Sequence, residues 1–234
     1  MPLTDIALTP AMWALVAALG GLLAVDGVSM SQVMVSRPIV SATVGGALLG
    51  DAAGGMLVGA LLELLTMRHP PYGAASYPDT GPAGLIAGSA YAASGAASIE
   101  TLVAAVLVGW VIGWMGAYTG YMRRRVNERL LARPEWLAAD SRRLERRHRA
   151  AIAIDGMRGV FLTGGLLVPS VLLVTVVGVV PVGEIGTALG AGAVVLALAA
   201  SIGSGARTTA PDARAWAMVL LGALLVLAAL WGRP

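Results

Sequence analysis

Hydrophobic residues along this chain gather in long uninterrupted runs, and charged residues fall between the runs. A helix that crosses the hydrocarbon core of a bilayer needs about 20 residues with few or no charges. Runs of about this length without a charged residue occupy six ranges: 6–25, 80–99, 101–122, 159–183, 185–206 and 215–232. The pattern predicts an all-α, polytopic integral membrane protein with about six long hydrophobic helices. We expect all of residues 1–234 to form one membrane-embedded domain.

Between the first two long runs, the hydrophobic stretches are too short to cross a membrane. Three of them, 27–36, 38–50 and 52–62, are bounded by charged residues, and prolines interrupt the same region. Backbone that is not helical at membrane depth persists only when it is buried in protein or lines a wet cavity. We therefore expect short re-entrant or broken helical segments in the N-terminal half, a pattern that often marks the binding site of a transporter.

Composition agrees with a membrane protein, and the charge is concentrated in one place. The chain is 57% hydrophobic and 12% charged, whereas a soluble domain is about a quarter charged. Ten of the 16 basic residues, all arginine, lie within 123–149. By the positive-inside rule this segment is a cytoplasmic loop, and its charge does not indicate binding to nucleic acid. Apolar residues recur in it at intervals of four and seven, which fits either a short amphipathic helix or a solvated loop: Val126, Leu130, Leu137 and Leu144.

Residues for enzymatic or metal chemistry are scarce. There is no cysteine, and the two histidines, His69 and His148, lie outside the predicted spans and far apart in sequence. A zinc site of the H-E-x-x-H type is absent, and we expect no metal, no cofactor and no catalytic residue. Glycines recur at small-xxx-small spacing, as in Gly55/Gly59, which predicts close contacts between helices.

Two acidic residues in the N-terminal half are the main candidates for binding a polar solute. Glu63 is flanked by aliphatic residues, where a charge without a partner costs several kcal/mol. It either accepts hydrogen bonds from solute hydroxyls or pairs with Arg37 or Arg68. Asp79 lies in a segment rich in proline and glycine just before a hydrophobic run. It either binds solute or caps the N-terminus of a helix.

Weaker candidates follow the first run. Asp26 and Gln32 either line a cavity or cap a helix. Arg37-Pro38 and Gly50-Asp51 frame a 13-residue segment, whose length suits a re-entrant element, and we interpret Arg37 and Asp51 as structural.

Three motifs in this order resemble a known family, the membrane subunit IIC of the mannose/fructose/sorbose class of sugar phosphotransferase systems (PTS). The resemblance covers mainly residues 22–95. The motifs are Ser36-Arg37-Pro38-Ile39-Val40 continuing to Gly45-Gly46-Ala47-Leu48-Leu49-Gly50-Asp51, then Gly59-Ala60-Leu61-Leu62-Glu63-Leu64, then Gly73-Ala74-Ala75-Ser76-Tyr77-Pro78-Asp79.

The resemblance implies a permease subunit of the bacterial inner membrane that imports a hexose-type sugar. A IID membrane subunit would complete the pathway, and the complex would form a higher oligomer. Phosphate would pass from phosphoenolpyruvate through HPr and IIA to a phosphohistidine on IIB, so the IIC chain carries no phosphoryl group itself. The implied substrate-binding residues are Glu63, Asp79, Gln32 and Asp26. The implied structural motif positions are Arg37, Pro38, Gly50, Asp51, Gly73 and Pro78.

Two other functions fit the same pattern. One is a transporter for another polar solute that works without the phosphorelay. The other is a regulatory membrane protein that kept the fold and lost transport, with segment 123–149 holding cytoplasmic partners.

Overall fold

The computed structural model describes residues 8–30, 33–67, 77–131 and 141–180, and isolated positions between 183 and 199. The described residues form α-helices and no strand, which confirms the predicted all-α class. In chain order the helices are α1 (Pro10–Val28), α2 (Pro38–Leu48), α3 (Ala52–Thr66), α4 (Thr80–Ser94), α5 (Ile99–Leu131) and α6 (Ser141–Val179).

Three of these helices, α1, α5 and α6, are long and apolar enough to cross a membrane. They contain most of the predicted runs 6–25, 101–122 and 159–183. The run 80–99 does not form a fourth span, because α4 has only 15 residues and ends at Gly95, whose φ is +62°. Apart from isolated positions, the runs 185–206 and 215–232 lie outside the described residues. The predicted number of about six long helices is therefore not confirmed.

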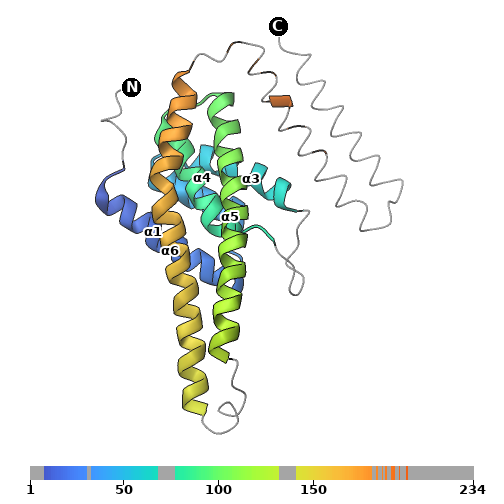
Figure 1. Ribbon diagram of the computed structural model, residues 1–234. Helices are drawn as coiled ribbons and strands as arrows, with labels where there is room; N and C mark the ends of the chain where they lie inside the picture. Colours follow the sequence, from blue (N-terminus) through green and yellow to red (C-terminus); the bar gives the residue numbers. More distant parts are fainter. Residues whose placement is uncertain are drawn as a thin grey trace.

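Helices α5 and α6 are longer than a membrane requires. They have 33 and 39 residues, or about 50 and 58 Å at 1.5 Å per residue, against a hydrocarbon core of about 30 Å. The two helices lie side by side and extend together well beyond the rest of the molecule (Figure 1). Much of segment 123–149, which we interpreted as a loop, is thus helical. Arginine and glutamate end a membrane span, but they are good helix formers and need not end the helix.

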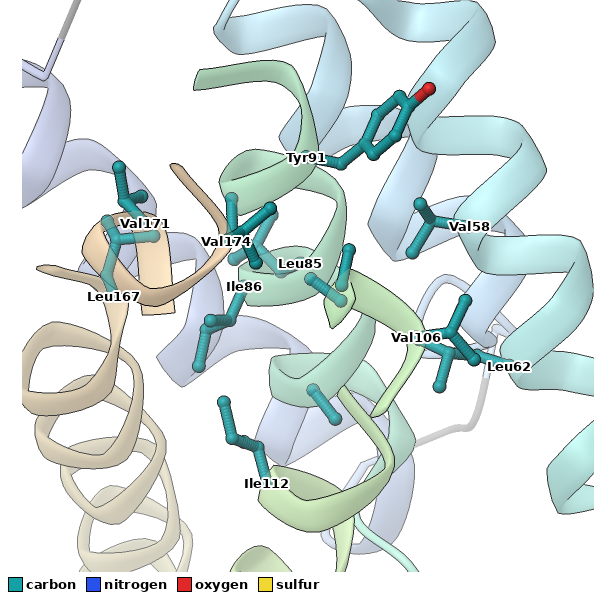
Figure 2. Packing of buried hydrophobic residues seen from close by; sticks show 14 of the residues in the cluster. Val58, Leu62, Leu85, Ile86, Tyr91, Val106, Ile112, Leu167, Val171 and Val174 are labelled. Carbon is teal, nitrogen blue, oxygen red and sulfur yellow. The ribbon is translucent and has the colours of Figure 1, made fainter. Parts of the chain in front are cut away.

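The short helix α4 forms the centre of the packing. Thirteen of its 15 residues are buried, and it contacts each of the other helices. Figure 2 shows Leu85 and Ile86 of α4 between side chains of the neighbouring helices, among them Val58 of α3, Val106 of α5 and Val171 of α6. Burial on all sides explains how a helix too short to cross the membrane is held within the bundle.

Helices α2 and α3 form a tight hairpin. Proline is favoured in the first turn of a helix, and Pro38 begins α2. Gly50 turns the chain with φ at +94°, a conformation open to glycine, and the Asp51 side chain then caps α3 by accepting a hydrogen bond from the Gly54 N–H at 2.8 Å. This capping hydrogen bond is a structural contact of the kind that we interpreted for Asp51 from the sequence. The helices have 11 and 15 residues, in line with the short segments predicted here, and their re-entrant placement in a membrane stays a prediction.

Candidate functional site

A cavity of about 660 Å³ lies where the ends of several helices meet. Its wall includes the C-terminal ends of α1 and α3, the N-terminal ends of α2 and α4, one side of α5, and Arg158 from α6. The described part of the lining carries four arginines, three carboxylates and five hydroxyl-bearing residues: Arg37, Arg123, Arg124 and Arg158; Asp26, Glu63 and Asp79; Ser36, Thr66, Tyr77, Thr80 and Tyr121. Such a lining offers hydrogen-bond donors and acceptors to a polar solute.

The charged groups on one side of the cavity form a network around Asp155. This carboxylate lies on α6 behind the cavity wall and is fully buried, with 0% exposure. Its Oδ1 lies 2.9 Å from Arg158 Nε and 3.3 Å from Arg123 Nε, while its Oδ2 accepts a hydrogen bond from the Ser29 hydroxyl at 2.5 Å. Asp155 therefore joins α6 to α5 and to the end of α1.

Arg158 extends this network to the cavity and to α4. Its Nη1 lies 2.7 Å from Asp79 Oδ2 and also donates to Thr119 Oγ1 at 3.1 Å and to the Gly116 carbonyl at 3.3 Å. One guanidinium thus connects the buried carboxylate of Asp155, the largely buried carboxylate of Asp79 and the backbone of α5. A bridging arginine in this position holds the start of α4 against the α5–α6 pair.

Asp79 occupies the N-cap position of α4, but its side chain makes no capping hydrogen bond. Its backbone N–H donates to the Gly113 carbonyl of α5 at 2.9 Å. Its carboxylate lies so close to Gly116 that a Cβ placed there would be 2.5 Å from the Asp79 Cβ. Of the two roles left open by the sequence, the capping contact is therefore not formed, and the carboxylate is directed to Arg158 at the cavity.

Glu63, on α3, is another carboxylate of the cavity lining. One carboxylate oxygen forms an ion pair with Arg37, and the other accepts a hydrogen bond from the Ile39 N–H at 3.2 Å. The pair with Arg37 that the sequence offered as an alternative is present, and Arg68 lies outside the described residues. Both partners line the cavity, so a structural pair does not exclude a direct contact with solute.

Asp26 shapes the connection between α1 and α2. It is 7% exposed, and its two carboxylate oxygens accept hydrogen bonds from the N–H groups of Val33 and Ser36 at 2.8 and 2.9 Å. Asp26 also lines the cavity. Of the two roles considered for it, the cavity position is present, and the carboxylate binds the backbone of the α1–α2 connection instead of capping a helix. Gln32 and Gly73, two other residues named from the sequence, lie outside the described residues.

The remaining described motif positions lie either in the cavity wall or at the turn between α2 and α3. Pro38 and Pro78 both line it. Gly50 and Asp51 form the turn between α2 and α3. Among the described residues, no group of histidine, aspartate and glutamate side chains is placed to hold a metal ion.

Sequence reasoning missed the α5–α6 part of the site. Arg123 counts in the sequence only as part of the basic segment 123–149, and neither Asp155 nor Arg158 is singled out there. A signal was available, since Asp155 and Arg158 are three residues apart in a helix, and ionisable residues at the edge of a span are often functional. Asp79, the partner of Arg158, is 79 residues away in sequence (158 − 79), so this pairing requires the fold.

The long apolar helices and the polar cavity between them define a helical integral membrane protein built around an internal polar site. Within that class, the chain belongs to the family described as the PTS system sorbose-specific IIC component, whose family model matches residues 8–163. The resemblance found in the three motifs is thereby confirmed. IIC components are membrane permease subunits for sugar transport and are not catalytic themselves.

Comparison with solved structures supports the fold. A chain titled "Structure of membrane protein" superposes with a TM-score of 0.67 at 16% identity, covering 97% of this chain and 89% of that one. At 16% sequence identity, the similarity supports the fold alone. A search of the curated proteins finds no match.

Proposed function

We propose that this chain is the sugar-translocating IIC subunit of a phosphoenolpyruvate-dependent PTS, and that it imports a hexose-type sugar together with a IID subunit across the bacterial inner membrane. The observation that carries the proposal is the cavity. Its volume of about 660 Å³ falls in the range of about 300–1,000 Å³ typical of small-molecule sites. Three acidic residues named from the sequence, Asp26, Glu63 and Asp79, line it together.

The chemistry of the lining suits a polyol. Carboxylates accept hydrogen bonds from sugar hydroxyls and guanidinium groups donate to hydroxyl oxygens, and such charge-assisted bonds are stronger than neutral ones. Glu63 with Arg37, and Asp79 with Arg158, give the cavity lining two pairs that each combine an acceptor and a donor group. A sugar ring carries hydroxyls around its edge that can bind to both kinds of group.

Transport in this proposal follows alternating access. The sugar enters from outside, sits in the cavity, and is released as the short helices α2 and α3 move relative to the α5–α6 scaffold. The phosphohistidine of IIB then transfers its phosphoryl group to a sugar hydroxyl on the cytoplasmic side, which traps the product. HPr and IIA supply IIB, and the permease works as a higher oligomer in the lipid bilayer.

Glu63→Gln tests the direct contact with sugar. The change removes a charge at almost constant shape, and hydrogen bonds to charged groups contribute about 1.5–3 kcal/mol, so we expect hexose affinity to fall about ten- to hundredfold. Binding of labelled hexoses to the purified complex measures the effect.

The matched control is Glu145→Gln, which also removes a carboxylate paired with an arginine, but at an exposed position on α6. It should leave affinity unchanged. Wild-type affinity in well-folded Glu63→Gln protein would argue that Glu63 serves only its pair with Arg37.

The partner prediction is tested by purification. A tagged chain extracted from its native membranes in mild detergent should bring down a IID-like membrane subunit in comparable amount, identified by mass spectrometry. A chain that runs alone and well folded would count strongly against the PTS permease.

Uptake assays separate the proposed function from its competitors. Uptake by the PTS permease should depend on phosphoenolpyruvate and the cytoplasmic PTS proteins. Sugar uptake that is driven by an ion gradient, or substrate counterflow without IIB, would indicate an independent transporter. Absence of saturable sugar binding in the complete complex would favour a regulatory protein.

A further inference from the structure

The described charges in the cavity wall do not balance among themselves. Four arginines and three carboxylates line the cavity, which leaves one excess positive charge. Asp155 supplies the fourth carboxylate from behind the wall, in contact with two of the four arginines. With Asp155 counted, the described charged groups of the site sum to zero.

Asp155 also determines where the arginines point. Arg158 binds Asp155 through Nε and turns Nη1 toward Asp79 and the cavity. Arg123 has its Nε at 3.3 Å from the same carboxylate oxygen. Asp155 is fully buried and has three partners on three different segments. Its position is therefore fixed, because a buried charge is tolerated only when it is paired and hydrogen-bonded.

An uncharged solute and an anion interact differently with the charged groups of this site. A sugar adds hydroxyls to groups whose described charges already sum to zero, at little electrostatic cost. A phosphate ester would compete with Asp155 for Arg123 and Arg158, or with Glu63 for Arg37, and it would face nearby carboxylates. Selectivity of this kind rests on repulsion of the competitor as much as on attraction of the substrate.

We infer that Asp155 is a positioning and specificity-determining residue: it neutralises and orients Arg123 and Arg158, so that the cavity accepts a neutral sugar and rejects the phosphorylated product. The inference rests on the proposed function. Rejection of the product makes transport unidirectional, because the phosphate ester formed at the cytoplasmic side does not bind again in the cavity.

Asp155→Asn tests the inference in the purified IIC–IID complex. The probes are sorbose, fructose and mannose, the phosphate ester of whichever binds best, and inorganic phosphate. A unit of uncompensated charge close to a partly buried site is a strong perturbation. We expect the ratio of hexose affinity to ester affinity to fall at least tenfold, and phosphate to become a competitor in the variant.

A double variant separates the role in charge from a general loss of structure. Arg123→Gln combined with Asp155→Asn restores the neutral sum and allows an amide pair in place of the ion pair. Its selectivity should return to within about threefold of wild type. Reaction of Arg158 with phenylglyoxal, followed by mass spectrometry, gives a second readout. It should be faster in Asp155→Asn than in wild type, because a guanidinium that has lost a partner is more accessible.

The outcomes are distinct. Unchanged selectivity and unchanged Arg158 reactivity in folded Asp155→Asn would overturn the inference, as would wild-type protein that binds the ester as tightly as the sugar. If the wild-type complex binds none of the three hexoses, the proposed function fails. The inference is then decided by phosphate alone, which must bind to Asp155→Asn and not to wild type.

Discussion

Replacing Arg158 with methionine should destabilise the folded protein by about 3–5 kcal/mol, the usual cost of removing one partner from a buried ion pair. The guanidinium connects Asp79 and Asp155, both of which are buried or nearly so, and it also donates to Thr119 and the Gly116 carbonyl. Methionine keeps much of the length of the side chain and removes all of these contacts. Asp79 would keep no ion-pair partner among the described residues, and the start of α4 would lose its attachment to α6.

Unfolding of the purified chain by increasing mole fraction of sodium dodecyl sulfate in mixed micelles, followed by tryptophan fluorescence, measures the loss. The matched control is Arg149→Met. Arg149 also lies on α6 and pairs with a carboxylate, Glu145, but both side chains are exposed. Exposed pairs contribute about 0–1 kcal/mol, so the control should remain close to wild type.

The double variant Asp79→Asn with Arg158→Met gives a further check. Removing the orphaned charge should recover part of the lost stability, because the two residues act as one unit. If Arg158→Met and Arg149→Met are equally stable, the buried network does not hold the helices together.

The sequence predicted the helices that are built from simple runs. In α1, α5 and α6, about 20 apolar residues occur without a charge, and length alone indicates a span. The prediction of a span over 80–99 failed, because a count of charged residues does not detect a helix end at Gly95. The left-handed conformation of Gly95 ends α4 and leaves four residues before α5 begins at Ile99. Glycine at a helix C-terminus is a known stop signal. Because glycine, alanine and serine occur throughout this run, Gly95 does not stand out in the sequence.

The residues of the site, like the helices, could be predicted from the sequence only in part. Glu63, Asp79 and Asp26 were found because each is a charge in an apolar or irregular context, where a partner or a function is required. The arginines that α5 and α6 contribute to the cavity could not be found in this way. Arg123 and Arg158 end hydrophobic runs, and charges at such positions are usually read as topology signals. Arg158 is three residues from Asp155 on α6, but only the packing of α5 against α6 brings Arg123 to the same carboxylate.

The packing of α2 against α4 predicts the second large effect. A Cβ added at Gly88 of α4 would lie 2.1 Å from the carbonyl oxygen of Ala42, and one added at Gly45 of α2 would lie 2.3 Å from the carbonyl oxygen of Leu85. The two helices are therefore in backbone contact in both directions, and a methyl group at either position has backbone in its way. Overpacking usually costs about 1–3 kcal/mol where side chains can move. Because backbone cannot yield in the same way, Gly88→Ala should cost about 3 kcal/mol or more.

The same detergent titration measures this loss, and α6 provides a glycine for comparison. A Cβ at Gly165 meets nothing within 4 Å, and alanine is favoured over glycine in a helix by up to about 1 kcal/mol. Gly165→Ala should therefore be neutral or slightly stabilising, while Gly88→Ala separates α2 from α4. Pro38 of α2 and Thr80 of α4 both line the cavity, so sugar binding should be lost along with stability in Gly88→Ala. Gly88→Ala protein as stable as wild type, with unaltered binding, would mean that α2 and α4 are not in backbone contact and that the cavity does not depend on their close approach.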